Sequence, residues 1–304
     1  MQLCGYHHRE YAFALSDFGE PISLPQSGGW LLQRSVPGSN YRDAMGCYPF
    51  FACNRWDDLF GDLRERKDQW IATWLVTDPF ADVEVRKLHS YFNDVCFLFK
   101  EHSIVDLSMD RNDTVSRHHQ RYARKALKCI DIRTPASPAA CLEEWTELYG
   151  NLIRKHGIKG ISCFSKWSFA HQLKVPGCVV FQAICKERVI AMQIWYQYND
   201  RAYYHLGASS DEGYKRYAAF GLFWKAIGYF KKQGLQWLSL GAGAGTRSNV
   251  DNGLARFKKG WSNAVRPVYF CGIIMDPKRY AWLCQRQEKV NNPYFPAYRA
   301  GEII

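Results

Sequence analysis

The stretch HLGASSDEGYKRYAAFGLFWKAI, residues 205–227, begins as a strand, passes through a polar turn and ends as an apolar helix. Gly213, Lys215 and Arg216 stand at the joint between strand and helix. A helix N-terminus offers unpaired N–H groups and a partial positive charge, so a glycine and two cations at this joint predict an anion site. The competing interpretation is an ordinary helix start, with Ser210 or Asp211 as its N-cap.

The elements around this joint predict a mixed α/β fold. Three strands with short turns precede it, namely CVVFQAIC, VIAMQIWYQY and RAYYHLGAS, which end at Ser209. Before them lie a short strand at 129–133 and two helices, at 139–157 and 165–174. After the joint we expect one helix over 213–233, a strand at 235–241, a helix at 251–261 and a strand at 266–276. The chain contains no internal sequence repeat.

The first part of the chain alternates strand-like pieces with turn signals. IATWLV and CFLFKEHSIVDLS read as strands, and DDLFGDLRERKDQ reads as a helix. With 304 residues, the chain is long enough for two domains, which we expect at 1–128 and 129–304. We expect the final 20 residues or so to pack back on the first domain.

Charge and cysteine content narrow the function classes. Forty Lys and Arg against 29 Asp and Glu give a net charge of +11, which favours an anionic partner. The eleven cysteines form no CxxC pair, so reduced thiols and a cytoplasmic location are expected. The start, MQLCGYHHRE, has no export signal, and no apolar run is long enough to span a membrane.

Several of these segments carry a resemblance to a known family. HLGASSDEGYKRYAAFGLFWKAI, LQWLSLGAGAG and DNGLARFKKGW, with LYGNLIRKHGI and FSKWSFAHQLKVPG upstream, resemble a GNAT acyltransferase domain of the FemAB-like branch. The resemblance covers about 130–285 and implies tandem GNAT-like domains, the first degenerate and a candidate for holding the acceptor. It also implies transfer of an acyl group from acetyl-CoA, a longer acyl-CoA or a carrier-protein thioester to the amine of a small molecule or peptide.

The resemblance assigns the donor to the end of the third strand and the joint. The donor-binding residues would be Leu206, Gly207, Ala208, Gly213, Lys215, Arg216 and Tyr217. GNAT enzymes that use acetyl-CoA usually carry a Gln/Arg-x-x-Gly-x-Gly/Ala loop here, whereas this chain has Asp211 and Glu212 and a single glycine. Some FemAB-like relatives use aminoacyl-tRNA as donor, so this is the second hypothesis. A third is an inactive GNAT-like module that binds a nucleotide or RNA.

Two residues are candidates for catalysis. Strand alternation places Tyr203, His205 and Gly207 on one face and Tyr204, Leu206 and Ala208 on the other. A neutral His205 is suited to accept the amine proton near pH 7, although a lone strand histidine is more often structural. Lys258 and Lys259 resemble the Phe-Lys element of FemAB-like proteins. Lys258 would then stabilise the oxyanion, while a solvated helix face is the alternative.

A basic stripe is expected on the helix at 117–128. Arg117, Arg121, Arg124, Lys125 and Lys128 recur at three- and four-residue spacing, which gathers them on one face. The stripe, together with Trp195, would hold an anionic acceptor or the phosphates of a tRNA, unless it is simply solvated.

Two further patterns are interpreted as structural. GAGAG at 241–245 lacks the acid that a dinucleotide site requires about 20 residues later, so a glycine-lined strand end that permits close approach is expected. The pairs His7–His8 and His118–His119 are adjacent in sequence and point apart, so no metal site is expected.

Overall fold

The structure is a computed structural model that describes residues 3–243, 253–289 and 292–302. The chain divides into two compact units. Unit 1 comprises residues 1–5, 100–158 and 169–266, and unit 2 comprises 6–99, 159–168 and 267–304. The predicted boundary at 128/129 differs from this division, because the chain crosses between the units several times. Residues 267–304 are grouped in unit 2 with residues 6–99.

Unit 2 is built on a mixed sheet in the strand order β1-β2-β3-β4-β11. The strands β1, β2 and β3 form an antiparallel meander, β4 is parallel to β3, and β11 is antiparallel to β4. The strand bounds are β1 Glu20–Leu24, β2 Gly29–Ser35, β3 Arg42–Gly46, β4 Ala72–Val76 and β11 Ala264–Ile274. The helices of this unit are α1 Arg9–Phe13, α2 Leu59–Glu65, α3 Val85–Tyr91 and α11 Pro277–Arg286, with 3-10 turns at Gly5–His7, Trp56–Asp58, Gly160–Ser162 and Ala297–Arg299.

Unit 1 repeats this arrangement of strands. The strands β7, β8 and β9 form an antiparallel meander, β10 is parallel to β9, and β5 is antiparallel to β10, while β6 extends the other edge. The strand bounds are β5 Val95–Asp106, β6 Asp131–Arg133, β7 Cys178–Cys185, β8 Arg188–Tyr198, β9 Arg201–Ser209 and β10 Trp237–Ser239. The helices are α4 Arg111–Thr114, α5 Arg117–Ala126, α6 Leu142–His156, α7 Lys166–Gln172, α8 Asp211–Lys215, α9 Ala218–Lys232 and α10 Gly253–Lys259, with a 3-10 turn at Pro138–Cys141.

The shared strand pattern confirms the expected mixed α/β fold. In each unit a three-strand meander is followed by a helical segment and a parallel fourth strand, as expected for tandem GNAT-like units. The antiparallel fifth strand is long in both cases, and β5 and β11 each begin in one unit and end in the other. The repeat is structural, since the sequence pattern alone contains no sign of it.

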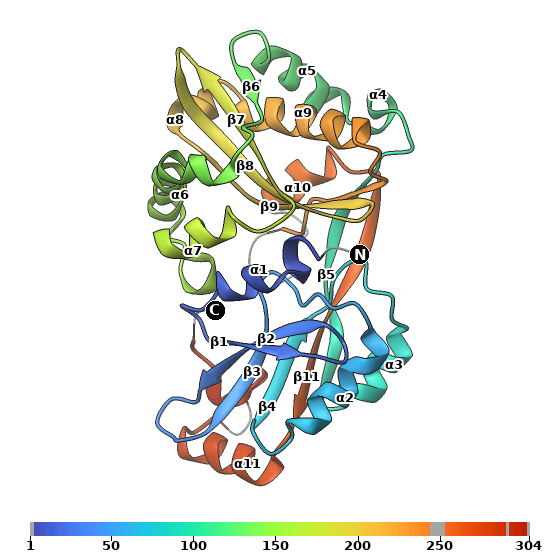
Figure 1. Ribbon diagram of the computed structural model, residues 1–304, viewed down its shortest axis with the longest axis vertical. Coiled ribbons are helices and arrows are strands. Elements are labelled where there is room, and N and C mark those ends of the chain that lie inside the picture. The colour runs from blue at the N-terminus through green and yellow to red at the C-terminus, as the bar shows by residue number, and fades with distance from the viewer. Residues whose placement is uncertain (1–2, 244–252, 290–291, 303–304) are drawn as a thin grey trace. The chain divides into compact units, whose positions relative to one another are not determined.

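The core of unit 1 lies between its sheet and the helix α9. Trp195, Phe223 and Phe230 are almost fully buried, and the Phe223 ring stacks on Trp261 with ring centroids 5.6 Å apart. The helices α5 and α9 lie side by side (Figure 1), and the small Gly221 allows Ala126 and Ile130 to approach α9 closely. On the other side, α6 packs against β8 and β9.

The helix expected at 213–233 is two helices. Ser210 caps α8 by accepting from the N–H of Gly213, and the chain then turns at Tyr217, whose φ of 58° lies in the left-handed region. A non-glycine residue in that region ends a helix, so α9 restarts at Ala218. Periodicity does not reveal this break because Gly213–Tyr217 contains no proline and only one glycine.

Candidate active site

The strands β9 and β10 part after a short parallel ladder. Arg201, Ala202 and Tyr203 pair with Trp237, Leu238 and Ser239. Beyond Tyr203, β9 continues to Ser209, whereas β10 ends, and the following residues pair with β5 through the Leu240 N–H and the Ser103 carbonyl at 2.9 Å. Among the described residues, the edge of β9 beyond Tyr203 is therefore not paired with β10. We call this region the gap, and the side chains around it form the candidate active site.

A bulge in β9 changes which side chains face the gap. Trp195 pairs with Tyr204 and Ile194 with Leu206, which leaves His205 as the extra residue of the bulge. After the bulge, Gly207 lies on the face of Tyr204: a Cβ at Gly207 would be 2.1 Å from the Tyr204 hydroxyl. The predicted alternation is therefore wrong from residue 206 onward, because a bulge shifts the two-residue period by one. The glycine makes room for the Tyr204 hydroxyl above the strand.

Lys258 reaches this region from α10. Only 7% of its surface is exposed, so the solvated-face alternative is excluded for Lys258, whereas Lys259 is exposed. The Nζ of Lys258 donates to the carbonyl of Ala242 at 2.7 Å and lies 5.7 Å from the centroid of the Tyr204 ring. Gly241, with φ of 74°, permits this approach, since its Cβ would lie 3.1 Å from Nζ. Residues 244–245 of the GAGAG segment lie outside the described residues.

The surroundings of Lys258 favour its neutral form. Burial, and secondarily the nearby Lys100, lower the pKa of Lys258 to about 7. Lys100 on β5 donates to the carbonyl of Gly243 at 3.1 Å, and burial also lowers its pKa. The two lysines thus hold consecutive carbonyls of the segment that follows β10. Near neutral pH, Lys258 is able to exchange a proton at Nζ, which an exposed lysine does poorly.

A buried histidine lies beneath the two lysines. His102 on β5 contacts the Ser239 hydroxyl through Nδ1 at 3.1 Å. Burial, followed by the charges of Lys258 and Lys100, lowers the pKa of His102 to about 3. His102 is therefore neutral over the physiological range, and its hydrogen bond joins β5 to the end of β10.

His205 lies on the other face of the sheet. Its Nε2 donates to the Gln172 Oε1 at 3.0 Å, and its ring packs on Tyr196 with centroids 4.9 Å apart. Burial lowers the pKa of His205 to about 3. The hydrogen bond to α7 and the low basicity favour the structural interpretation of His205, because a general base works best with a pKa near the working pH.

The predicted donor-binding residues occupy different environments. Leu206 and Ala208 are buried, and Tyr217 turns the chain into α9. A Cβ at Gly213 would lie 2.3 Å from the Ile190 carbonyl, so this glycine permits close packing of α8 on β8. At the joint, Arg216 pairs with Glu212, and Lys215 is exposed. Ser210 therefore caps the start of α8, and Asp211 and Glu212 partly neutralise the positive charge there. This arrangement agrees with the interpretation of the joint as an ordinary capped helix start.

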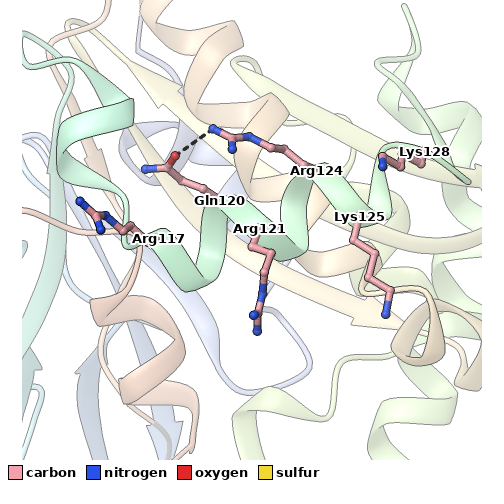
Figure 2. Close-up of a pocket in the computed structure, with 6 residues that line it drawn as sticks. All are labelled: Arg117, Gln120, Arg121, Arg124, Lys125 and Lys128. Carbon is pink, nitrogen blue, oxygen red and sulfur yellow. Dashed lines mark hydrogen bonds between the residues drawn. The ribbon is translucent and has the colours of Figure 1, made fainter.

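The basic stripe is assembled as expected. Arg117, Arg121, Arg124, Lys125 and Lys128, with Gln120, line a hollow of about 540 Å³ along α5. Figure 2 shows Arg121 and Lys125 extending from the same side of the helix, while Arg124 donates to Gln120 at 3.2 Å. Trp195 is not part of this surface. It is fully buried between Tyr204 and Phe230, which leaves it no surface for an acceptor.

The described residues contain neither a metal-binding cluster nor a membrane-spanning helix. Among the described residues, no group of three or more His, Cys, Asp or Glu side chains is arranged to hold a metal ion. Within the same residues, every helix is too short or too polar to cross a membrane.

Comparison with known proteins identifies the domain that carries most of these residues, although Lys100 and His102 lie before it. Residues 112–259 match the family model described as the acetyltransferase (GNAT) domain. This segment is a GNAT acetyltransferase domain. It contains α5, β9, the joint and Lys258, so the predicted resemblance and the predicted enzyme class, an acyltransferase of the GNAT type, are confirmed. No curated protein matches the chain significantly.

Solved structures share the fold beyond the GNAT domain. FemX covers 90% of this chain and 93% of its own, at 14% identity and a TM-score of 0.64. The C-terminal domain of a putative lysylphosphatidylglycerol synthetase from Agrobacterium fabrum covers 94% of this chain and 91% of its own, at 12% identity and a TM-score of 0.65. L-PGS from Bacillus licheniformis covers 91% of this chain and 95% of its own, at 15% identity and a TM-score of 0.58. At these identities the likeness establishes the fold alone.

Sequence reasoning missed three residues around the gap. Strand alternation predicts Tyr204 on the face opposite Gly207, and for Lys100 and His102 the sequence pattern indicates only a strand. The signal available in the sequence was the polar triplet Lys100-Glu101-His102 inside an otherwise apolar strand. Charged residues in a central strand are seldom buried without a reason.

Proposed function

We propose that the chain transfers an acyl group to an amine, with the donor carbonyl lying in the gap between β9 and β10. The observation that carries the proposal is the buried Nζ of Lys258 beside Tyr204, at the point where the two strands part. A donor arm that adds to the open edge of β9 would run from Tyr204 toward Ser209, much as an added strand does.

In this reaction Lys258 accepts the amine proton. The amine nitrogen attacks the donor carbonyl, and the proton it loses passes to the neutral Nζ of Lys258. The Tyr204 hydroxyl, above Gly207, donates a hydrogen bond to the oxyanion of the tetrahedral intermediate. The carbon–sulfur or carbon–oxygen bond then breaks, and the leaving thiolate or alkoxide takes the proton from Lys258 Nζ. This releases the donor's thiol or hydroxyl and restores neutral Lys258. This assignment replaces His205 as base and changes the role of Lys258 from oxyanion stabiliser to base.

A thioester of coenzyme A is the first donor candidate, with the amine of a small molecule or peptide as acceptor. An aminoacyl-tRNA is the second, and one observation favours it: the start of α8 is capped by Ser210 and carries two acids, which is unlike an open pyrophosphate site. The test is to supply the protein with acyl-CoAs or aminoacyl-tRNA and a panel of amines, and to detect acylated amines by mass spectrometry. Absence of amide product with every donor contradicts the proposal.

The pH dependence of turnover provides a sharper test. Because only neutral Lys258 accepts a proton, the rate is expected to rise with pH through about 7. Lys258→Arg places a guanidinium here that stays protonated at every working pH and cannot accept the proton. The rate should therefore fall on the order of a hundred- to ten-thousand-fold, and the rise of the rate near pH 7 should disappear. Lys259→Arg, at the exposed neighbour, is the matched control and should keep both rate and profile. A Lys258→Arg protein with a normal profile would exclude Lys258 as base.

A further inference from the structure

The basic hollow along α5 begins beside the helix that carries Lys258. The Ser116 N–H, at the start of α5, donates to the Gly260 carbonyl at 3.0 Å. His119 Nε2 donates to the carbonyl of Phe257, the residue before Lys258, also at 3.0 Å. The His119 ring occupies the space that a Cβ at Gly260 would fill. The first turn of α5, including Arg117, is therefore fixed against α10.

Lys125, toward the other end of the hollow, contacts the residue before α9. Lys125 Nζ lies 4.6 Å from the centroid of the Tyr217 ring, and Tyr122 packs on the same ring at 4.5 Å. Tyr217 is the N-cap residue of α9 and makes no side-chain cap. The helix dipole of this 15-residue helix favours an anion at its start. Arg117 and Lys125 are eight positions apart on α5, a rise of about 12 Å.

The charges lining the hollow suit several phosphates. Its lining consists of five cations and Gln120 and includes no carboxylate. The acids of the neighbouring joint are directed to other partners, since Asp211 pairs with Lys155 and Glu212 with Arg216. Three of the five cations are arginines, which bind phosphate oxygens in a bidentate manner. A surface that is lined by cations and one amide is suited to anionic groups.

We infer that this hollow binds the phosphates of the acyl donor's nucleotide. The inference rests on the proposed function. It assigns the basic stripe to binding of the donor instead of the acceptor. It also replaces Lys215 and Arg216 as the main phosphate contacts. The shared chemistry is a phosphorylated adenosine end, which coenzyme A carries as its 3′-phospho-ADP part and an aminoacyl-tRNA as its 3′-terminal nucleotides. Such a ligand would place its phosphates on α5 and extend its reactive arm along β9 toward Lys258.

The experiment measures binding by calorimetry with four probes: CoA, pantetheine, inorganic pyrophosphate and a short RNA ending in CCA. The wild type is expected to bind CoA or the RNA more tightly than pantetheine, which lacks the nucleotide. The double variant Arg121→Gln with Lys125→Gln should bind the nucleotide probe at least on the order of tenfold more weakly than the wild type does. Its affinity for pantetheine should be unchanged. The preferred probe, CoA or RNA, identifies the source of the phosphates. Lys174→Gln with Lys232→Gln, two exposed lysines elsewhere in unit 1, is the matched control and should bind like the wild type.

Two outcomes overturn the inference. One is a loss of nucleotide binding in Lys215→Gln with Arg216→Gln while the α5 variant binds normally. The other is equal transfer from acyl-pantetheine and acyl-CoA by the wild type, which leaves the proposed function intact. Conversely, nucleotide binding that depends on α5, in a protein that acylates no amine with any donor, supports the inference and contradicts the proposed function. Thermal melting of each variant confirms that it is folded before its binding is compared.

Discussion

At the scale of single residues, position relative to the sheet separates the two catalytic candidates. His205 and Lys258 are both buried and both have lowered pKa values. His205 faces Gln172 and Tyr196, whereas Lys258 faces Tyr204 and the segment after β10. Burial alone therefore does not mark a catalytic group. The neighbours of each residue determine whether a substrate in the gap would meet it.

His205→Ala tests this distinction directly. The substitution leaves the buried Gln172 amide without its histidine donor, so the free energy of unfolding should fall by about 1–3 kcal/mol. Turnover per folded molecule should stay close to that of the wild type, because His205 lies away from Tyr204 and Lys258. Urea unfolding and a rate corrected for folded protein measure the two effects. A hundredfold slower enzyme of unchanged stability would restore His205 as the base.

At the scale of elements, α8 explains why the joint differs from an open phosphate loop. Ser210 accepts from Gly213 and also donates from its hydroxyl to the Ile190 carbonyl at 3.0 Å. Gly213 packs on the same carbonyl, so α8 is held against β8 by backbone contacts. The glycine that suggested close approach of a phosphate is accounted for by close approach of the protein itself.

Gly213→Ala should therefore destabilise the fold. A Cβ at this position meets backbone atoms at 2.3 Å, and relief requires a shift of α8, so a loss of about 1–3 kcal/mol is expected. Gly150→Ala in α6 is the control, because its Cβ meets only the end of the Arg154 side chain at 3.5 Å and alanine favours helix by up to about 1 kcal/mol. Chemical denaturation compares the two. If Gly213→Ala is as stable as the wild type, the packing account of Gly213 fails.

At the scale of the whole molecule, each unit has its own stabilising core, and unit 2 contains a buried ion pair. Arg299, in the C-terminal segment, donates to Asp43 on β3 through Nε at 2.6 Å and Nη2 at 2.9 Å. Both side chains are at most 1% exposed, and Tyr298 donates to the same carboxylate at 2.8 Å. This network fastens residues 298–299 to β3 across more than 250 positions of sequence.

Removing one partner of this pair should be costly. Asp43→Asn removes the buried counter-ion of the Arg299 guanidinium and leaves it paired only with Glu302, which is 26% exposed. The free energy of unfolding should therefore fall by about 3–5 kcal/mol. Arg279→Gln breaks a mostly exposed pair with Asp276 and should cost less than about 1 kcal/mol. Equilibrium unfolding in urea, followed by tryptophan fluorescence, gives both values. Equal small losses for the two variants would mean that the buried network contributes little.

The sequence by itself determined the elements and the family. Strand-like runs separated by short turns predicted β7, β8 and β9. The charge spacing on 117–128 predicted the basic face of α5, and the resemblance of several segments to a known family predicted the GNAT domain. These features are local, because side-chain period, turn residues and short motifs act within a few residues of one another. The same local rules missed the break at Tyr217 and the bulge at His205, since both involve one residue's backbone conformation within an otherwise regular pattern.

The tertiary structure alone decided which residues meet. Lys100, Tyr204 and Lys258 come from a strand, another strand and a helix that are far apart in the chain, and their proximity follows from the pairing of β5 and β9 with β10. The burial that lowers the pKa of Lys258 depends on that assembly. The exchange of long strands between the units likewise depends on non-local pairing, which no period in the sequence encodes. Local patterns specify elements, whereas burial, pKa values and the candidate site arise only when distant elements pack together.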